Sequence, residues 1–142
     1  MREAGGVKND RYAVRYLLPV AVWMLVIFVS SSIPQDDFPR LEFWGWAKLV
    51  HLIYYGVLCL LCQRALSAQT RFPVLARHSY LLGVLFAVLY GLSDEYHQLS
   101  TPGRHGQLID VLIDCFGALL CIGGLGAYRM LRPRPAGDTS GE

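Results

Sequence analysis

The feature that most constrains the fold is a series of four apolar runs, at residues 16–33, 47–66, 79–92 and 110–131. The third run continues through Gln98 as a polar end. A helix needs about 20 apolar residues to cross a hydrocarbon core of about 30 Å. Charged residues make up 17% of the chain, against roughly 25% in average soluble proteins, so they are too few to cover a soluble domain of this size. The sequence predicts an all-α polytopic membrane protein, a bundle of four transmembrane helices.

This membrane domain is expected to occupy residues 16–131, between a short basic tail at 1–15 and a disordered tail at 132–142. A basic start followed by an apolar run is also the pattern of a signal peptide. A retained helix is favoured, because no small-x-small cleavage pattern follows the run. Residues 34–46 are expected to form a loop whose aromatic residues, Phe43, Trp44 and Trp46, anchor it at the membrane interface.

The distribution of Lys and Arg predicts the orientation in the cell membrane. With four spans, ten of the thirteen basic residues lie on one side and three lie on the other. The three are Arg40, Lys48 and Arg104. Cytoplasmic loops carry the excess of positive charge, so we expect both termini to be cytoplasmic. The net charge is only +2, which gives no indication of a nucleic-acid partner.

The stretch between the third and fourth runs, residues 93–114, is densely polar and is expected to face outward. Asp110 and Asp114 are one helical turn apart, and Gly117 continues the same stripe. Charged groups inside a membrane face the bundle rather than lipid, and a glycine on that stripe allows a close helix–helix approach. In the second run, Lys48 and His51 share one helical face. We therefore expect an outward-facing polar pocket.

The candidate residues of this pocket fall into two groups. The candidates for acid or base catalysis are Asp94, Glu95, His97 and Asp110. The candidates for binding are Lys48, His51, Tyr55, Gln98, Arg104 and Asp114.

Three interpretations of the pocket stay open. The first is a network of ion pairs that fixes helix packing. The second is a divalent-metal site, for which the ligands would be Asp94, Glu95, His97, Asp110 and Asp114. There is no fixed pattern such as H-E-x-x-H, so no residue is assigned as a metal ligand. The third is an anion site, where Arg104 and Lys48 would hold a phosphate or carboxylate and His51, His97 or His105 would act as acid or base.

Two other groups of polar or reactive residues have simpler interpretations. Ser30, Ser31 and Ser32 end the first run and could add hydroxyl contacts to the pocket, although such a run at a helix end usually serves capping. The four cysteines all lie in apolar runs, and we expect them to act as small buried hydrophobes.

The polar stretch resembles the signature of VanZ-like membrane proteins. The matching segments are Asp94-Glu95-Tyr96-His97-Gln98, Pro102-Gly103-Arg104, Asp110-x3-Asp114-x2-Gly117, Ser31-Ser32-Ile33-Pro34 and Lys48-x2-His51-x3-Tyr55. Two positions depart from the family pattern: Ala47 stands where an aspartate is usual, and Asp114 stands where asparagine is frequent. The resemblance implies a small multi-helix integral membrane protein of the cell envelope. The named member of the family is associated with low-level resistance to the glycopeptide teicoplanin.

Three functions are consistent with these patterns. The first is a non-enzymatic protein that binds a lipid-linked or cell-wall component and affects glycopeptide susceptibility. The second is a membrane-embedded enzyme that acts on a lipid head group or phosphate. The third is a small transporter, which is disfavoured because four short helices without broken-helix repeats offer little for alternating access. The bilayer is the expected partner, and a homo-oligomer could form.

Overall fold

The computed structural model describes residues 10–34, 45–104 and 108–131, and within them the regular structure is entirely helical. The elements are η1 (Ala13–Leu17, a π-helical turn), α2 (Leu18–Ser31), α3 (Gly45–Ala68), α4 (Pro73–Arg77), α5 (Ser79–Gln98) and α6 (Leu108–Leu131). The all-α prediction is thereby confirmed. The C-terminal tail, most of the N-terminal tail, His105, and Phe43 and Trp44 of the aromatic loop lie outside the described residues.

The first helix begins earlier than the sequence suggested. It runs without interruption from Asp10 to Ser31, and Pro19 lies in its interior. Proline lacks an N–H and its ring clashes with the carbonyl four residues earlier. The π-helical turn directly before Pro19 widens the helix at that point, which accommodates the ring. The loop expected at residues 67–78 also contains the short helix α4, with Pro73 at its first position, where proline is favoured.

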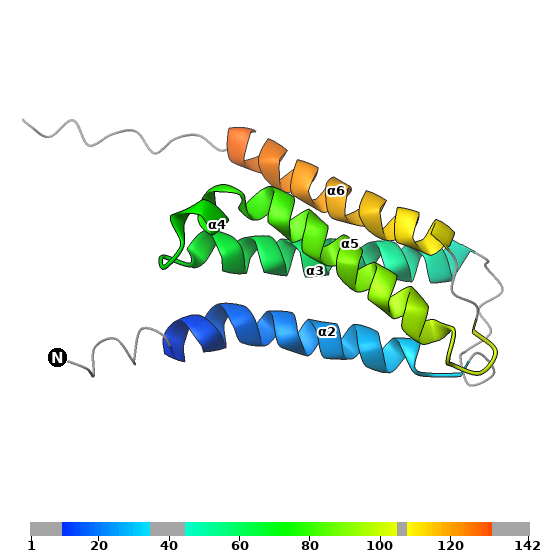
Figure 1. The fold of residues 1–142 in the computed structure, drawn as a ribbon. Helices are drawn as coiled ribbons and strands as arrows, with labels where there is room; N and C mark the ends of the chain where they lie inside the picture. Colours follow the sequence, from blue (N-terminus) through cyan, green and yellow to red (C-terminus); the bar gives the residue numbers. More distant parts are fainter. Residues whose placement is uncertain (1–9, 35–44, 105–107, 132–142) are drawn as a thin grey trace, which may run out of the picture.

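The four long helices run antiparallel in sequence order (Figure 1). α2 starts and α6 finishes at the same end of the bundle. α3 packs extensively against both α5 and α6, whereas α2 lies along the bundle with fewer contacts. At the opposite end of the bundle, the C-termini of α2 and α5 therefore lie beside the N-termini of α3 and α6.

The contact between α3 and α6 depends on Gly117. A Cβ atom at this position would overlap the Leu52 carbonyl oxygen and lie 3.0 Å from Leu52 Cα. No side chain fits there, so the two helix backbones approach closely, as small residues allow in membrane bundles. The predicted role of Gly117 is confirmed.

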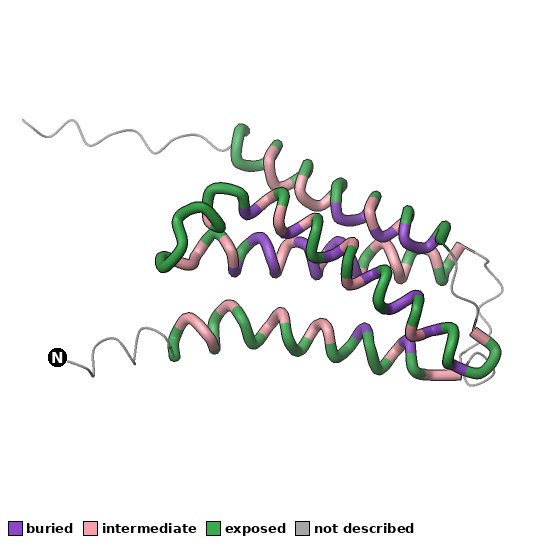
Figure 2. The backbone as a smooth tube through the Cα atoms, in the orientation of Figure 1, coloured by how far each residue is buried: buried purple, intermediate pink, exposed green. Residues whose placement is uncertain are grey.

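Buried and exposed positions alternate along the helices of the bundle (Figure 2), and the buried ones include charged as well as apolar residues. On α6, Asp110 and Asp114 are buried, whereas the large apolar side chains point outward. The outward residues are Leu108, Ile109, Leu112, Phe116, Leu119 and Leu120. Within the described residues, three helices are long and apolar enough to cross a membrane: Asp10–Ser31, Gly45–Ala68 and Leu108–Leu131. α5 is not among them, since its last turns are polar.

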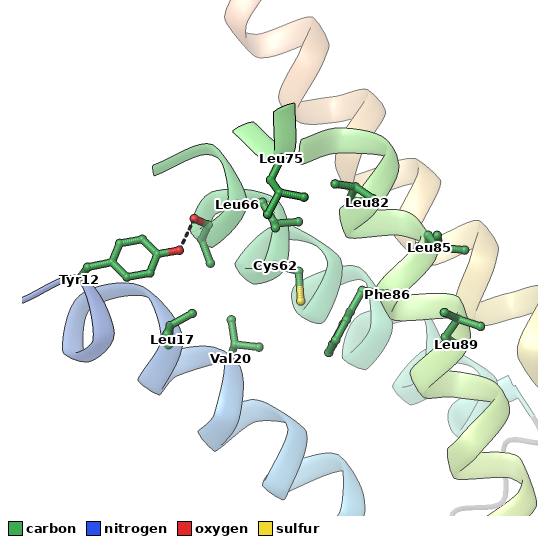
Figure 3. A pocket seen from close by; sticks show the side chains of 11 residues that line it. Tyr12, Leu17, Val20, Cys62, Leu66, Leu75, Leu82, Leu85, Phe86 and Leu89 are labelled. Carbon is green, nitrogen blue, oxygen red and sulfur yellow. Dashed lines mark hydrogen bonds between the residues drawn. The ribbon is translucent and has the colours of Figure 1, made fainter. Parts of the chain in front are cut away.

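An apolar groove separates α2 from α5 in the half of the bundle farther from the polar end (Figure 3). Its volume is about 370 Å³. Tyr12 closes one end of it by donating a hydrogen bond to the Ala65 carbonyl at 2.8 Å. The lining residues are Tyr12, Leu17, Val20, Cys62, Ala65, Leu66, Leu75, Leu82, Leu85, Phe86 and Leu89. Cys59 and Cys62 are buried free thiols in apolar surroundings, which confirms their predicted role as small hydrophobes.

Candidate functional site

The ten candidate residues do not form a single pocket. Nine of them lie at or near the end of the bundle where α2 and α5 finish, and Tyr55 lies deeper. Eight of the ten, all but Tyr55 and His97, separate into two groups, the second of which also includes Ser31 and Thr101. We call the group between α3, α5 and α6 the inner cluster: Lys48, His51, Glu95, Asp110 and Asp114. We call the group where α2 meets α5 the α2 junction: Ser31, Asp94, Gln98, Thr101 and Arg104.

The centre of the inner cluster is a contact among three helices. His51 Nδ1 of α3 lies 3.2 Å from Asp114 Oδ1 of α6 and 3.9 Å from Glu95 Oε1 of α5. One nitrogen or oxygen atom from each of these residues lies within 4.8 Å of the others. The Asp114 side chain is completely buried, and the other two are nearly so. These three residues could hold a metal ion, and the contacting carboxylates could orient the imidazole for proton transfer.

Lys48 and Asp110 form an ion pair close to this centre. Lys48 precedes His51 by about one turn of α3, and Asp110 precedes Asp114 by about one turn of α6. The Lys48 ammonium contacts the Asp110 carboxylate directly, and both side chains are mostly buried. The Lys48 ammonium therefore pairs with Asp110, which is one of the three carboxylates of the inner cluster.

Asp114 Oδ2 and the Tyr55 hydroxyl are among the buried polar atoms that make no hydrogen bond with another described residue. The Tyr55 hydroxyl lies near the Asp94 carboxylate. The Tyr55 and His51 rings are nearly parallel, with centroids 6.1 Å apart. A Cβ atom at Gly91 would lie 2.9 Å from Asp114 Oδ2 and 3.4 Å from the Tyr55 ring. The backbone of α5 at Gly91 thus packs directly against the Asp114 carboxylate and the Tyr55 ring, and separates them from the lipid on that side.

The α2 junction is organised around the buried Asp94 carboxylate. Its Oδ2 accepts hydrogen bonds from Ser31 Oγ at 2.8 Å and from Gln98 Nε2 at 3.1 Å. Thr101 Oγ1 donates to the Ser31 carbonyl at 3.3 Å. The Ser31 and Thr101 bonds therefore join the last turn of α2 to the C-terminal end of α5 and the loop after it.

Arg104 completes the junction from the loop that follows α5. Its Nε donates to the Ile33 carbonyl at 3.2 Å and its Nη2 to the Ser30 carbonyl at 3.1 Å. A positive group at a helix C-terminus is stabilising. Burial lowers the pKa of the Arg104 guanidinium, although the charges of Asp94 and Glu95 act in the opposite direction. The guanidinium remains charged at neutral pH.

A tight turn positions the Arg104 side chain. The Arg104 N–H donates to the Thr101 carbonyl at 3.1 Å, and Gly103 has a φ of 72°. Proline at the second position and a positive φ at the third are typical of a type II turn. Arg104 and Lys48, which the anion-site interpretation placed together, therefore have separate contacts: Arg104 with α2, and Lys48 with Asp110.

His97 lies away from the inner cluster. Its ring stacks on Phe28 of α2 with centroids 4.6 Å apart, and its Nε2 lies 2.9 Å from Ser32 Oγ. The metal-ligand set considered from the sequence is therefore not assembled as a whole. The structure brings together His51, Glu95 and Asp114 instead, and it places Asp94 and His97 against α2.

The comparisons with known proteins identify the family. Residues 15–131 match the VanZ/LLP1 family model. The chain belongs to the VanZ/LLP1 family. Comparison with curated proteins gave no match, and comparison with solved structures gave none either. In this VanZ/LLP1 protein, the signature segments inferred from the sequence supply every residue of the inner cluster and every residue of the α2 junction except Thr101.

Sequence reasoning underrated the hydroxyl residues of this VanZ/LLP1 protein. Ser31 and Thr101 are both buried and both belong to the α2 junction. Ser30 Oγ lies 3.1 Å from the Tyr54 hydroxyl, which joins α2 to α3. The position of these residues in the sequence could have indicated this role. Hydroxyl groups at the end of an apolar span can bond to other helices as readily as they cap their own helix.

Proposed function

We propose that this VanZ/LLP1 protein spans the cell membrane four times and binds a lipid-linked cell-wall component at its polar end. Through this binding it affects susceptibility to glycopeptides of the teicoplanin type. One observation carries the proposal: the inner cluster gathers charged residues from three helices inside a bundle whose outer surface is apolar. Ionisable residues in such a position are costly and usually functional.

The fourth span in this proposal is α5. Its 20 residues correspond to about 30 Å of helix, the thickness of a hydrocarbon core. It lies antiparallel to α3 and α6 (Figure 1). Its polar residues Asp94, Glu95 and Gln98 are buried against other helices, so they need not face lipid. The polar last turns that reduce the hydropathy of α5 are therefore compatible with a spanning helix.

The orientation follows from the charge distribution. Among the described residues, six of the eight basic side chains belong to the end of the bundle where α2 starts and α6 finishes, and the inner cluster lies at the opposite end. The positive-inside rule then places the termini in the cytoplasm and the inner cluster near the outer face of the membrane. An outer location suits a protein that meets cell-wall components and glycopeptides.

The test uses a teicoplanin-susceptible bacterium that expresses the full chain. Fluorescent teicoplanin bound per cell is measured for the wild type, for Glu95→Gln and for the empty vector. We expect the wild type to reduce binding and Glu95→Gln to restore the level of the vector at equal membrane abundance. Ser93→Ala, an exposed change on α5, is the control and keeps the wild-type effect. Wild-type cells that bind as much teicoplanin as vector cells would overturn the proposal.

A second candidate function is an enzyme that acts on a lipid head group or phosphate. The contact of 3.2 Å between His51 Nδ1 and Asp114 Oδ1 favours it, because a carboxylate that orients an imidazole is a common arrangement for general acid–base catalysis. Purified protein incubated with envelope lipids would then form a product detectable by mass spectrometry. Product formation that continues unchanged in His51→Gln would exclude this role.

A further inference from the structure

We propose that His51, Glu95 and Asp114 bind one divalent transition-metal cation of the Zn²⁺ or Mn²⁺ type. The three side chains come from α3, α5 and α6, so the site exists only when these helices are packed together. One candidate ligand atom from each lies within 4.8 Å of the others. Ligands that bond to one ion at about 2.0–2.2 Å lie at most about 4.4 Å apart. The separations of 3.2 Å and 3.9 Å from His51 Nδ1 fall within this limit, and any wider separation between the two carboxylates needs only a small side-chain adjustment to hold the ion.

The chemistry of the donors indicates the class of cation. One imidazole nitrogen and two carboxylates form a mixed nitrogen and oxygen set. Imidazole suits transition metals such as Zn²⁺, whereas carboxylates suit Mn²⁺ as well as Mg²⁺ and Ca²⁺. Three protein ligands leave coordination positions open, as in catalytic rather than structural zinc sites. The set therefore favours a transition-metal cation that can take a further ligand.

A second observation is independent of the acidic character of the cluster. Asp114 is 1% exposed, and its Oδ2 has no hydrogen-bond partner among the described residues. An unsatisfied buried polar atom costs about 1–3 kcal/mol, and more when it is charged. The same carboxylate already contacts His51 through Oδ1. A bound cation would satisfy Asp114 directly or through a water in its coordination sphere.

The cation would also deepen the proposed function. Its open positions could take phosphate oxygens of a lipid-linked head group, as metal ions do when they orient phosphoryl groups. This use of the cation rests on the proposed function, whereas binding of the cation does not. The experiments below contain no cells and no added lipid, so they test the metal site separately from glycopeptide susceptibility.

The first measurement is the metal content of the full chain, purified in detergent with a tag that contains no histidine. We expect elemental analysis to find about one Zn²⁺ or Mn²⁺ per chain, because ligands preassembled by folding retain their metal. His51→Gln and Asp114→Asn should lower the metal affinity at least about tenfold, since even residues that only orient a ligand commonly contribute 10–100-fold. His78→Gln is the matched control, at an exposed histidine on the opposite end of α5, and should retain the metal.

The second measurement replaces the native metal with Co²⁺ after chelation. The wild type and His78→Gln should develop the visible d–d absorption of a protein-bound cobalt ion, and His51→Gln should not. His51→Cys should keep cobalt and add a thiolate-to-cobalt charge-transfer band, which a merely structural His51 would not produce. This variant keeps a ligand at the position if His51→Gln fails to fold. A wild-type protein that takes up neither Zn²⁺, Mn²⁺ nor Co²⁺ would overturn the proposal, as would equal binding by Asp114→Asn.

Discussion

The Ser31 hydroxyl donates a hydrogen bond to Asp94 Oδ2 across 2.8 Å, and both side chains are buried where α2 meets α5. In the half of the bundle farther from this junction, an apolar groove separates these two helices. Between the groove and the junction, the Tyr90 hydroxyl donates to the Met24 carbonyl at 2.8 Å. The position of α2 against α5 therefore depends on a few polar contacts rather than on continuous packing.

Replacing Ser31 with alanine should destabilise the protein. The change removes one of two donors to the buried Asp94 carboxylate, and loss of a partner of this kind costs about 1–3 kcal/mol. Thermal unfolding of the purified protein in detergent, followed by circular dichroism, measures the effect. Ser93→Ala is the control, because Ser93 is exposed and bonds only to the Tyr90 carbonyl of its own helix. Equal shifts for the two variants would show that the Ser31 bond contributes little.

The helices were readable from the sequence because apolar length and periodicity are local properties. The predicted extent of α5 agrees with the observed one, Ser79–Gln98. The start of the first helix was misplaced, because Arg11 and Arg15 were assigned to a tail. Long basic side chains can extend away from a helix that enters a membrane, so charge alone did not mark its boundary. The extra turn also moved Pro19 into the helix interior.

The inner cluster was predictable only in part. Helical spacing showed that Lys48 and His51 share one face, and that Asp110 and Asp114 share another. Spacing within a helix does not determine which residues of two helices meet. The register between α3 and α6 depends on the close approach at Gly117. His97 was therefore grouped with Glu95, although it faces α2.

Gly117→Ala should weaken the packing of α3 against α6. The added methyl group would overlap the Leu52 carbonyl oxygen, so one backbone must shift, and overpacking of this kind costs about 1–3 kcal/mol. Gly124→Ala on the same helix is the control, because a Cβ atom there meets nothing within 4 Å. Its melting temperature should stay the same or rise, since alanine is the better helix former by up to about 1 kcal/mol. A Gly117→Ala protein as stable as the wild type would contradict this account of the interface.

The pair formed by Lys48 and Asp110 should behave as a coupled unit. Lys48→Met alone leaves a mostly buried carboxylate without its ion-pair partner, and losses of this kind reach about 3–5 kcal/mol in full burial. Asp110→Leu alone likewise leaves the Lys48 ammonium without this ion-pair contact. The double variant should lose less stability than the sum of the single variants, because no isolated charge remains. Unfolding of all four proteins in a double-mutant cycle measures the coupling energy. Strict additivity would mean that the contact contributes nothing.

The proposed topology predicts opposite labelling of two loops. In a background without the four native cysteines, Thr70→Cys and Ser100→Cys each introduce one thiol at an exposed position. Thr70 precedes α4 and Ser100 follows α5, so four spans with cytoplasmic termini place Ser100 outside and Thr70 inside. A membrane-impermeant maleimide added to intact cells should label Ser100→Cys alone, and permeabilised cells provide the control in which both react. Labelling of Thr70→Cys alone in intact cells would show that the protein has the opposite orientation in the membrane. Labelling of both would show that α5 does not span the membrane.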